Sequence, residues 1–588
     1  MVEGALPAQT TGGDSEKNVQ ATTTRPEQTY DPSKESRWTR LGLSLESFKR
    51  APGSTGGLKA EGEQADPLAA SVNPLLQQKL KPRHLNMIAM GGSIGTGLFV
   101  GVGQALRNGG PGGVLIAWSV IGVMLFNITQ ALGEMSIVYP VSGGFYTLVV
   151  RMVNPALGIA FGYNYILSWC IVFPLEITSA AITVQYWTDA VPIGAWITIF
   201  FLLVVVVNVF GSLGYAEEEF FSSLLKILVV AIFVIIGIVM NCGGGPSGSP
   251  YESYVGGKYF QDPGAFANGF KGVCAVFVTA AFSFAGTELV GIAATETPNP
   301  RKSMPTAVKG TFWRITCLYL TSLLIIGLNI PYDEPRLLGG SGTGTSPFVI
   351  LVDKARIGGL PHLINATICI SVLSIGLSCV YAGSRVLTAL AETGFAPRCF
   401  TMVDKSGRPL WSVVFVLAWG LLAYINLASS GATIFTWLTA ITGLATLISW
   451  FGICLAHLRF RAAWRAQGKS VEELPFRAFF GELGSWVGLI IITLVFIAQF
   501  YIALWPLRGS SLDPTFFFQA YLTAPVFLVC LVLAWVWKRG PIWLIPAHAI
   551  DLDTGRKSWF TVEEMRAYRA ERRAAPWYVR MYRILFTN

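Results

Sequence analysis

The stretch MIAMGGSIGTGLFVGVGQAL, residues 87–106, decides the fold class: it is long and apolar enough to cross a bilayer, yet it carries five glycines from Gly91 to Gly101. A glycine costs about 1 kcal/mol relative to alanine inside a helix, so we expect this helix to open between Ser93 and Gly97. Irregular backbone at membrane depth persists only where it is buried in protein or lines a cavity. The stretch therefore predicts a transmembrane helix that is broken at a functional site.

The opened backbone is suited to a negatively charged group. The second half of the helix begins with amides that lack partners, and its dipole favours an anion. We therefore expect a carboxylate at the amides near Gly95, Thr96 and Gly97, with Ser93 and Ile94 in the same segment. The alternative is that the glycines serve close packing between helices, as small residues do in membranes.

A second apolar span is also interrupted by polar residues. It reads AVFVTAAFSFAGTELVGIAATE, residues 275–296, with Ser283, Gly286, Thr287 and Glu288 near its middle. Paired interrupted spans in two halves of a chain indicate a secondary transporter built from inverted repeats. Free carbonyls at Phe282, Ser283 and Ala285 would accept hydrogen bonds from an ammonium group. Donors at one break and acceptors at the other suit the zwitterionic backbone of an amino acid.

Composition places the whole chain in a membrane. Of its 588 residues 52% are hydrophobic and 13% are charged, about half the roughly 25% of charged residues in a soluble domain. This balance excludes most soluble enzymes, coiled coils and disordered scaffolds. The nine cysteines lie mostly singly in apolar runs and the four histidines are scattered, whereas metal sites need clustered ligands. We expect no metal, no cofactor and no catalytic residues.

Long apolar runs separated by short polar breaks fill the middle of the chain. A membrane helix needs about 20 apolar residues, and this length predicts twelve spans in an all-α polytopic protein. The predicted spans are 86–107, 114–137, 157–187, 193–212, 219–240, 270–294, 313–331, 363–387, 411–428, 432–457, 484–506 and 516–537. Spans 1–5 and 6–10 would form the two repeats.

Basic residues predict the orientation, because loops on the cytoplasmic side carry an excess of lysine and arginine. The loops after spans 6, 8 and 10 are basic, whereas the opposite loops are glycine-rich. We therefore expect both termini in the cytoplasm, and we assign the net charge of +9 to contact with anionic lipid and not to nucleic acid. The expected domains are a disordered N-terminal tail (1–80), the first repeat (81–240), the second repeat (241–460), spans 11 and 12 (461–540) and a C-terminal tail (541–588).

Four ionisable residues fall inside the predicted spans, where charge is costly and usually functional. These are Glu134, Glu176, Lys226 and Glu288. A proton-coupled carrier needs a group that gains and loses a proton between its two states, and we expect Lys226, Glu134 or Glu176 to serve, with Glu288 at the substrate. As alternatives, Lys226 extends to the headgroups, and Glu134 and Glu176 are structural hydrogen-bond anchors. The acidic run 217–219 is expected to be a solvated helix end.

Several long motifs resemble the fungal amino-acid permeases. The motifs are MGGSIGTGLFVGVGQAL, ALGEM, FPLEITSAAITVQYW, SSLLKIL, FSFAGTELVGIAATETPNPRKSMPTAVKGTFWRI and YAGSRVLTALAETGFAPRCFTMVDKSGRP. These permeases belong to the amino acid–polyamine–organocation superfamily, and the resemblance implies the leucine-transporter fold and proton-driven uptake of L-amino acids at the plasma membrane. It further implies that residues 93–97 bind the substrate carboxylate, that the carbonyls of Phe282, Ser283 and Ala285 hold the amine, and that Lys226 takes the place of a sodium ion.

Other functions stay open beside this interpretation. A non-transporting sensor of the same fold, or a permease selective for basic amino acids, would share these motifs. A channel would need a ring of like polar side chains. Small polar residues of spans 3 and 10 favour broad or neutral specificity, namely Thr178, Ser179, Thr183, Thr436, Thr439 and Thr442. The unpatterned N-terminal tail carries Lys17, Lys34, Lys49 and Lys59, and we expect it to serve the ubiquitin-ligase machinery.

Overall fold

The computed structural model describes residues 35–52, 80–141, 143–297, 300–337, 346–427, 431–538, 544–556, 561–579 and 581. Within these residues the regular structure is helical, apart from one isolated bridge between Arg50 and Asp404. The longer helices are α3 (Val102–Val138), α5 (Pro155–Val184), α6 (Ile193–Val209), α7 (Gly211–Asn241), α8 (Gly269–Ser283), α13 (Leu360–Glu392), α15 (Gly431–Ala466), α16 (Gly481–Leu504) and α18 (Thr523–Lys538).

Shorter helices connect or extend these elements. They are α1 (Arg37–Arg40), α2 (Pro82–Gly91), α4 (Phe145–Met152), α9 (Leu289–Ala293), α10 (Pro300–Trp313), α11 (Thr321–Asn329), α12 (Pro347–Lys354), α14 (Leu410–Trp419), α17 (Pro514–Tyr521) and α19 (Val562–Ala574). The 3₁₀ and π turns are η2 (Leu45–Phe48), η4 (Gly97–Gly101), η5 (Phe260–Gly264), η6 (Ala294–Glu296), η7 (Arg314–Leu320), η8 (Pro335–Leu337), η10 (Arg398–Thr401), η11 (Gly420–Leu427), η12 (Val471–Glu473) and η13 (Ala547–Ala549).

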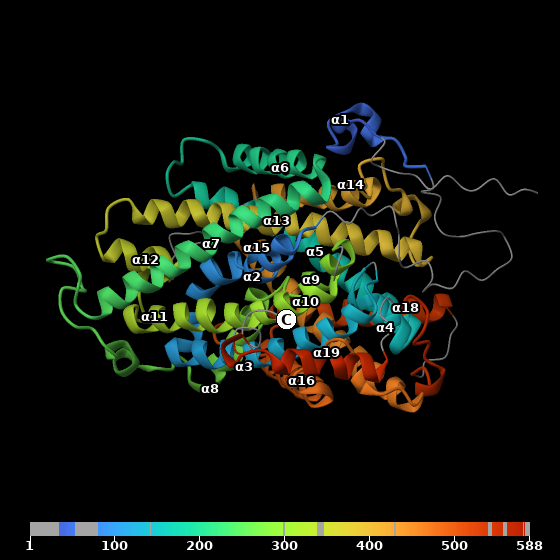
Figure 1. Ribbon diagram of the computed structural model, residues 1–588. Coiled ribbons are helices and arrows are strands. Elements are labelled where there is room, and N and C mark those ends of the chain that lie inside the picture. The colour runs from blue at the N-terminus through green and yellow to red at the C-terminus, as the bar shows by residue number, and fades with distance from the viewer. Residues whose placement is uncertain are drawn as a thin grey trace, which may run out of the picture.

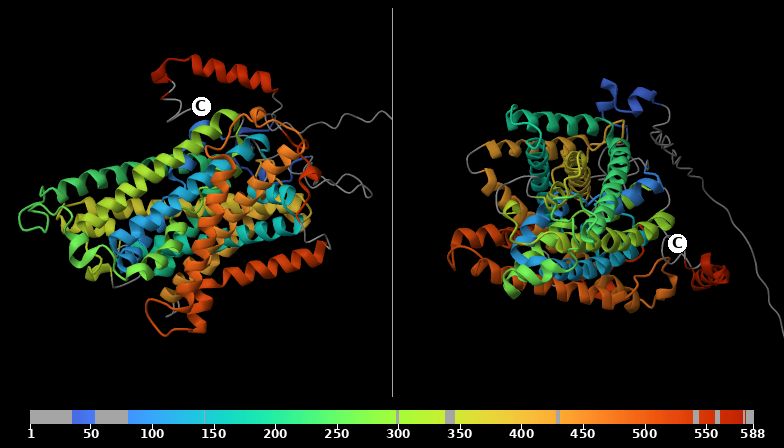
Figure 2. Two further views of the ribbon diagram at one scale, coloured as in Figure 1. Left: turned by 90° about the horizontal axis from the view of Figure 1, so that it is seen from below. Right: turned by 90° about the vertical axis from the view of Figure 1, so that its left-hand side faces the viewer.

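The long helices form one bundle, with α5 and α13 packed along each other (Figure 1). Helices at the outside expose apolar side chains, among them Ile235 on α7, Ile497 on α16 and Leu533 on α18, each about 60% exposed. Large exposed apolar faces of this kind suit lipid and not water. Helix α19 is polar and lies outside the bundle of long helices (Figure 2).

The long apolar helices of the structure agree with the prediction of several membrane-spanning helices. Among the described residues, eight helices are long and apolar enough to cross a membrane, and the bent pair α17 and α18 gives a ninth candidate. Two further predicted spans coincide with the shorter apolar helices α6 and α8. Predicted spans 1 and 2 run together in 97–138, where the backbone departs from the helix at Gly110 with φ of 74°. The helical, multi-pass prediction is confirmed, whereas twelve spans and the 5+5 repeat stay predictions.

A short N-terminal segment docks on the loop that follows α13. Its backbone bonds to that loop twice, from Ala51 N to the Val403 carbonyl and from Lys405 N to the Lys49 carbonyl, both at 3.0 Å. The hydrogen bond and charge of Lys405 hold the pKa of the Glu46 carboxyl below its ordinary value. Residues 35–52 are therefore folded, although they lie in the predicted disordered tail; the sequence analysis missed them because the segment is polar and packs on a distant loop. Residues 1–34 and 53–79 of that tail lie outside the described residues.

The C-terminal segment 544–556 is held at the ends of three helices. The hydroxyl of Tyr139, after α3, donates to the Leu552 carbonyl at 2.7 Å. The guanidinium of Arg151, on α4, donates to the Asp551 carbonyl at 2.7 Å and also to the Thr554 carbonyl. These donors bind main-chain carbonyls, so they fix the path of the chain whatever side chains it carries.

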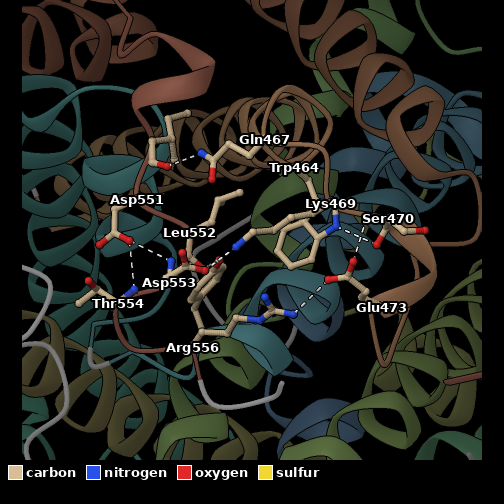
Figure 3. A network of polar contacts seen from close by, with 12 residues as sticks. Trp464, Gln467, Lys469, Ser470, Glu473, Asp551, Leu552, Asp553, Thr554 and Arg556 are labelled. Atoms are coloured by element: carbon tan, nitrogen blue, oxygen red, sulfur yellow. Dashed lines mark hydrogen bonds and ion pairs between the residues drawn. The ribbon is translucent and has the colours of Figure 1, made fainter. Parts of the chain in front are cut away.

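Helix α15 completes this attachment (Figure 3). Gln467, the residue after α15, donates to the Ile550 carbonyl at 2.6 Å. Arg556 lies over the ring of Trp464, 4.8 Å from its centroid, with Nη2 3.6 Å from the Glu473 carboxylate. Beyond it, the hydrogen bond from Arg566 on α19 lowers the pKa of the Glu472 carboxyl. Because that pKa is lowered in the folded state, this contact is present above the ordinary pKa of glutamate and is lost as the pH falls through the lowered value.

We expect Arg151→Ala to release the C-terminal segment. Arg151 is buried, and hydrogen bonds from a charged group are worth about 1.5–3 kcal/mol each, so amide hydrogen exchange over 545–556 should rise by at least about tenfold. The matched control is Lys469→Ala, which removes an ion pair with Asp553, whose side chain is 61% exposed. Exposed pairs contribute about 0–1 kcal/mol, so exchange should change little. Equal exchange in the two variants would contradict the assignment.

Candidate functional site

The first predicted break is present. Helix α2 ends at Gly91 and the π-helical turn η4 begins at Gly97. Between them the Ile94 amide makes a turn bond to the Gly91 carbonyl at 2.9 Å, and Leu98 and Phe99 both bond back to the Gly95 carbonyl. The glycines predict this opening correctly because they remove side chains that would favour a continuous helix.

The second predicted break is present as well. Helix α8 ends at Ser283 and α9 begins at Leu289. Gly286 has φ of 90°, a conformation that side chains other than that of glycine rarely adopt. Turn bonds run from Ala285 N to the Phe282 carbonyl and from Thr287 N to the Phe284 carbonyl. The helix is therefore interrupted at the residues that the sequence singles out.

The two breaks touch each other. A Cβ placed on Gly97 would lie 2.5 Å from the Cα of Ser283 and 2.9 Å from its amide nitrogen. The hydroxyl of Tyr319, on η7, lies 3.0 Å from the Ser93 carbonyl and 2.8 Å from the Ser283 carbonyl, one from each break. The opened backbones of the two predicted repeats thus meet at a point that accepts only glycine.

The packing interpretation of the glycines also holds. A Cβ on Gly91 would lie 2.0 Å from Ser223 Oγ on α7, and one on Gly95 would lie 2.0 Å from the end of Ile375 on α13. The sequence analysis treated close packing and helix opening as alternatives. The structure combines them, because the same glycine-rich segment is both interrupted and pressed against three neighbours.

A cavity lies at this meeting point. Six predicted site or coupling residues line it: Ser93, Gly97, Glu176, Phe282, Ala285 and Glu288. Residues that the sequence analysis missed complete the lining: Gly92, Tyr165, Ser168, Trp169, Val172, Ile375 and Thr446. Most of these come from α5 and α13, which carry no break and so gave no local signal.

The remaining predicted binding residues stand just outside the lining. Ile94 and Gly95 belong to the first break but do not line the cavity. Thr96 donates to the Glu176 carboxylate at 2.6 Å. The hydroxyl of Thr287 donates to the Phe284 carbonyl and accepts from Arg314 at 2.5 Å. Thr96 therefore reaches the cavity through Glu176, whereas the partners of Thr287 do not line it.

Two carboxyl groups face the cavity. Glu288 accepts from the indole of Trp450 at 3.1 Å, and its other oxygen is 3.4 Å from the Gly286 amide. Because an indole and an amide only donate, both oxygens of Glu288 act as acceptors. Glu176 and Glu288 are both buried. They place two acidic side chains at the site, where a cationic substrate would need one.

The small polar residues expected to line the pocket point elsewhere. Thr178 and Ser179 bond the carbonyls four residues earlier in α5, and Thr183 and Thr442 do the same in α5 and α15. They are not among the lining residues, whereas Thr446, one turn after Thr442, lines the cavity and bonds its own helix in the same way. The specificity that these residues were taken to favour stays a prediction. The side chains of Thr436 and Thr439 lie outside the described residues.

Lys226 is buried beside the first break. Its ammonium is 3.4 Å from the Gly91 carbonyl, at the last residue of α2. It is also 3.7 Å from the carboxylate of Glu219, and both side chains are fully buried. The prediction of a solvated acidic run is therefore wrong for Glu219, although Glu217 is partly exposed and pairs with Arg83 at 2.6 Å.

Glu134 lies away from the cavity in an ion-pair cluster. It is 2.6 Å from the Arg461 guanidinium and 3.2 Å from His457, both on α15, and it accepts from the Ala478 amide at 2.6 Å. These contacts tie α3 to α15 and to the loop before α16. They favour the alternative of a structural anchor, and a coupling role for Glu134 stays a prediction.

Arg314 is a buried cation that the sequence analysis missed. Its guanidinium donates to the Ala89 carbonyl on α2 at 2.6 Å and to Thr287 in the second break. The signal was available, because an arginine in an apolar span is costly, but Arg314 stands at the start of predicted span 313–331 and was not singled out. It links α2 to the second break and is not among the residues that line the cavity.

Sequence comparison identifies the family. Residues 84–544 match the model of the amino acid permease family, which covers both breaks, the cavity lining and Lys226. The chain belongs to the amino acid permease family. The resemblance seen in the motifs is confirmed, and this permease is a multi-pass membrane protein of a family that transports amino acids.

Similar permeases cover nearly the same length. The chain is 47% identical to the amino-acid permease inda1 of Hypocrea atroviridis over 96% of each chain. It is 48% identical to the general amino-acid permease GAP1 of Saccharomyces cerevisiae, over 82% of this chain and 81% of that protein. It is 43% identical to the histidine permease of the same yeast over 84% of each chain. These names include both broad and selective transporters, so they do not fix the substrate of this permease.

Proposed function

We propose that this permease imports L-amino acids together with protons across the plasma membrane by alternating access, with both termini in the cytoplasm. The observation that carries the proposal is the buried ammonium of Lys226 next to the Gly91 carbonyl at the first break. A sodium site at this position would need oxygen ligands around a space that the ammonium fills. A lysine is also a group that can release a proton, which a coupled carrier requires.

The substrate backbone would lie between the two breaks. The segment 93–97 would offer amides to the carboxylate, and Phe282 and Ala285 of the second break, whose carbonyls would hold the ammonium, also line the cavity. The Ser283 carbonyl already accepts from Tyr319 and the Phe282 carbonyl from the Ala285 amide, but each keeps a second lone pair for an ammonium group. The proposed site thus has hydrogen-bond donors at the first break and hydrogen-bond acceptors at the second break.

The test is uptake by purified protein in proteoliposomes. With an inward pH gradient and no sodium, the wild-type permease should concentrate labelled amino acid inside the vesicles. For one proton per substrate, a gradient of about one pH unit supports about tenfold accumulation. Accumulation that depends on sodium, or that is absent with a gradient, would refute proton coupling. Binding without any transport would support the sensor alternative, which the names of the similar proteins do not favour.

A second candidate is selectivity for basic amino acids, and the two cavity carboxylates favour it. We expect Glu288→Gln to weaken competition by lysine and arginine by about tenfold or more, because a charge-assisted hydrogen bond is worth about 1.5–3 kcal/mol, while competition by neutral amino acids changes less. A panel of twenty amino acids against one labelled substrate measures this. If lysine and arginine compete poorly in the wild type, the proposal of broad or neutral specificity stands instead.

We further propose that the N-terminal tail serves removal from the cell surface through ubiquitin ligases. Of the four lysines named above Lys49 is described, in the docked segment, and Lys17, Lys34 and Lys59 lie outside the described residues. Replacing these four lysines by arginine should prolong residence at the surface without changing transport by the purified protein.

A further inference from the structure

Helix α7 carries a polar stripe inside an otherwise apolar span. Glu219, Ser223 and Lys226 are four and three residues apart, a spacing that places side chains on one face of a helix. All three are buried. The stripe continues one turn earlier with Tyr215, whose side chain is buried as well. The permease mechanism proposed above uses the buried base, Lys226, but gives the buried acid, Glu219, no role.

The carboxylate of Glu219 is held by two helices. Its Oε1 accepts from Ser223 at 2.7 Å and lies 3.7 Å from the Lys226 ammonium. Its Oε2 accepts from Ser374 on α13 at 2.6 Å, with Ser378 at 3.4 Å. The carboxylate is therefore placed between the ammonium on one side and hydroxyl groups of a second helix on the other.

Hydroxyl groups extend this arrangement along the seam between α7 and α13. Ser222 and Ser374 are 2.8 Å apart, and Tyr215 and Ser378 are 3.1 Å apart. Tyr215 stacks on Tyr381, with 4.4 Å between ring centroids. Each hydroxyl both donates and accepts, so the seam is a connected polar path inside the bundle. It runs from the first break toward the end of α13 that carries the docked N-terminal segment.

Stability alone does not account for the pair. Burying two charges costs several kcal/mol of desolvation each, and buried pairs are often no more stabilising than apolar residues of the same size. The titratable side chains that interact with the pair are Glu176 on α5 and Tyr215 and Glu218 on α7, and His84 on α2 pairs with Glu217. Helix α13 presents the hydroxyls of Ser374 and Ser378 to Glu219 and carries Cys379, Tyr381 and Arg385 beyond them. The turn η7, which also packs on α7, carries Arg314, Cys317 and Tyr319. Helices α6 and α11, which also pack on α7, carry no ionisable side chain.

We propose that Glu219 is a proton-binding site that receives the proton of Lys226 and passes it along the α7–α13 seam. In the step, an N–H bond of the ammonium breaks and an O–H bond forms on Glu219, so that a charged pair becomes a neutral amine and a carboxylic acid. The 3.7 Å separation becomes a hydrogen bond after a shift of roughly 1 Å. The proton then leaves through the hydroxyls of Ser374, Ser378 and Tyr215 toward water. The inference rests on the proposed proton coupling.

The experiment compares Glu219→Gln with Glu217→Gln in proteoliposomes under an inward pH gradient of one unit without sodium. The glutamine side chain keeps the shape of Glu219, but its amide group binds no proton at the pH on either side of the vesicle membrane. We expect accumulation to fall from about tenfold in the wild type to about onefold, while exchange of labelled for unlabelled substrate continues and no longer varies with internal pH. Glu217 pairs with Arg83 at the helix end, so Glu217→Gln should accumulate like the wild type.

The outcomes separate the two proposals. If wild type accumulates substrate and Glu219→Gln does so equally, Glu219 is no proton site and proton coupling stands. If wild type itself does not accumulate, the proposed function fails first. If Glu219→Gln does not fold, the double variant Ser374→Ala/Ser378→Ala, which keeps both charges, should slow pH-driven uptake and shift its pH profile while leaving exchange in place. An unchanged pH profile in that variant would overturn the proposal.

Discussion

Gly97→Val should abolish amino-acid binding. A Cβ at this position would lie 2.5 Å from the Cα of Ser283, in the backbone of the other break. Backbone yields less than a side chain, and overpacking of this kind costs about 3 kcal/mol, which raises the dissociation constant about 100-fold. The added branch also restricts the opened backbone that would hold the substrate carboxylate. Binding of labelled substrate to purified protein measures the loss.

The matched control for this substitution is Gly113→Ala. Gly113 lies in α3, and a Cβ there would meet Val273 at 3.5 Å, an ordinary van der Waals contact. The control should bind like the wild type, and both variants should reach the cell surface. Wild-type affinity in well-expressed Gly97→Val would mean that the two breaks do not form the substrate site.

Lys226→Met should abolish pH-driven accumulation of substrate. The substitution removes the ammonium, which is the group proposed to release the coupling proton. It also leaves Glu219 buried without its ion-pair partner, which costs about 3–5 kcal/mol of stability. Downhill exchange should persist at a reduced rate. Uptake into proteoliposomes under an inward pH gradient measures the first effect and counterflow measures the second.

Two further variants separate charge from proton exchange. Lys226→Arg keeps a positive charge beside Glu219, but arginine does not lose its proton in proteins, so accumulation should still be lost. Lys258→Met removes an exposed lysine from the connection between α7 and α8 and should have no effect. If Lys226→Arg accumulates substrate as the wild type does, Lys226 supplies only charge and does not carry the coupling proton.

The sequence predicts the breaks because glycine acts locally. The opening at Ser93–Gly97 and the turn at Gly286 follow from residues within one stretch of chain, and helix propensity describes them. The walls contributed by Tyr165, Trp169 and Ile375 were not predicted, since these residues lie in unbroken helices. Their role depends on how helices pack, and one sequence does not report which distant helices meet.

The acidic run 217–219 shows a different limit of prediction from sequence. Successive residues of an α-helix point about 100° apart, so one run of three carboxylates cannot face a single environment. Glu217 reaches Arg83 at the helix end, whereas Glu219 turns inward to Ser374 and Lys226. The run was treated as a block of like charges, although the spacing of Glu219 to Lys226 already placed the two on one face.

The hydroxyl of Tyr319 has one proton and two carbonyl acceptors within reach, Ser93 and Ser283. At any moment it bonds one of them, and a rotation about its C–O bond transfers the bond to the other. The contact between the two broken helices at this point is therefore worth about one hydrogen bond, roughly 1 kcal/mol. If alternating access moves the two broken helices relative to each other, as proposed, the movement gives up only this small free energy at the Tyr319 contact and regains it on return.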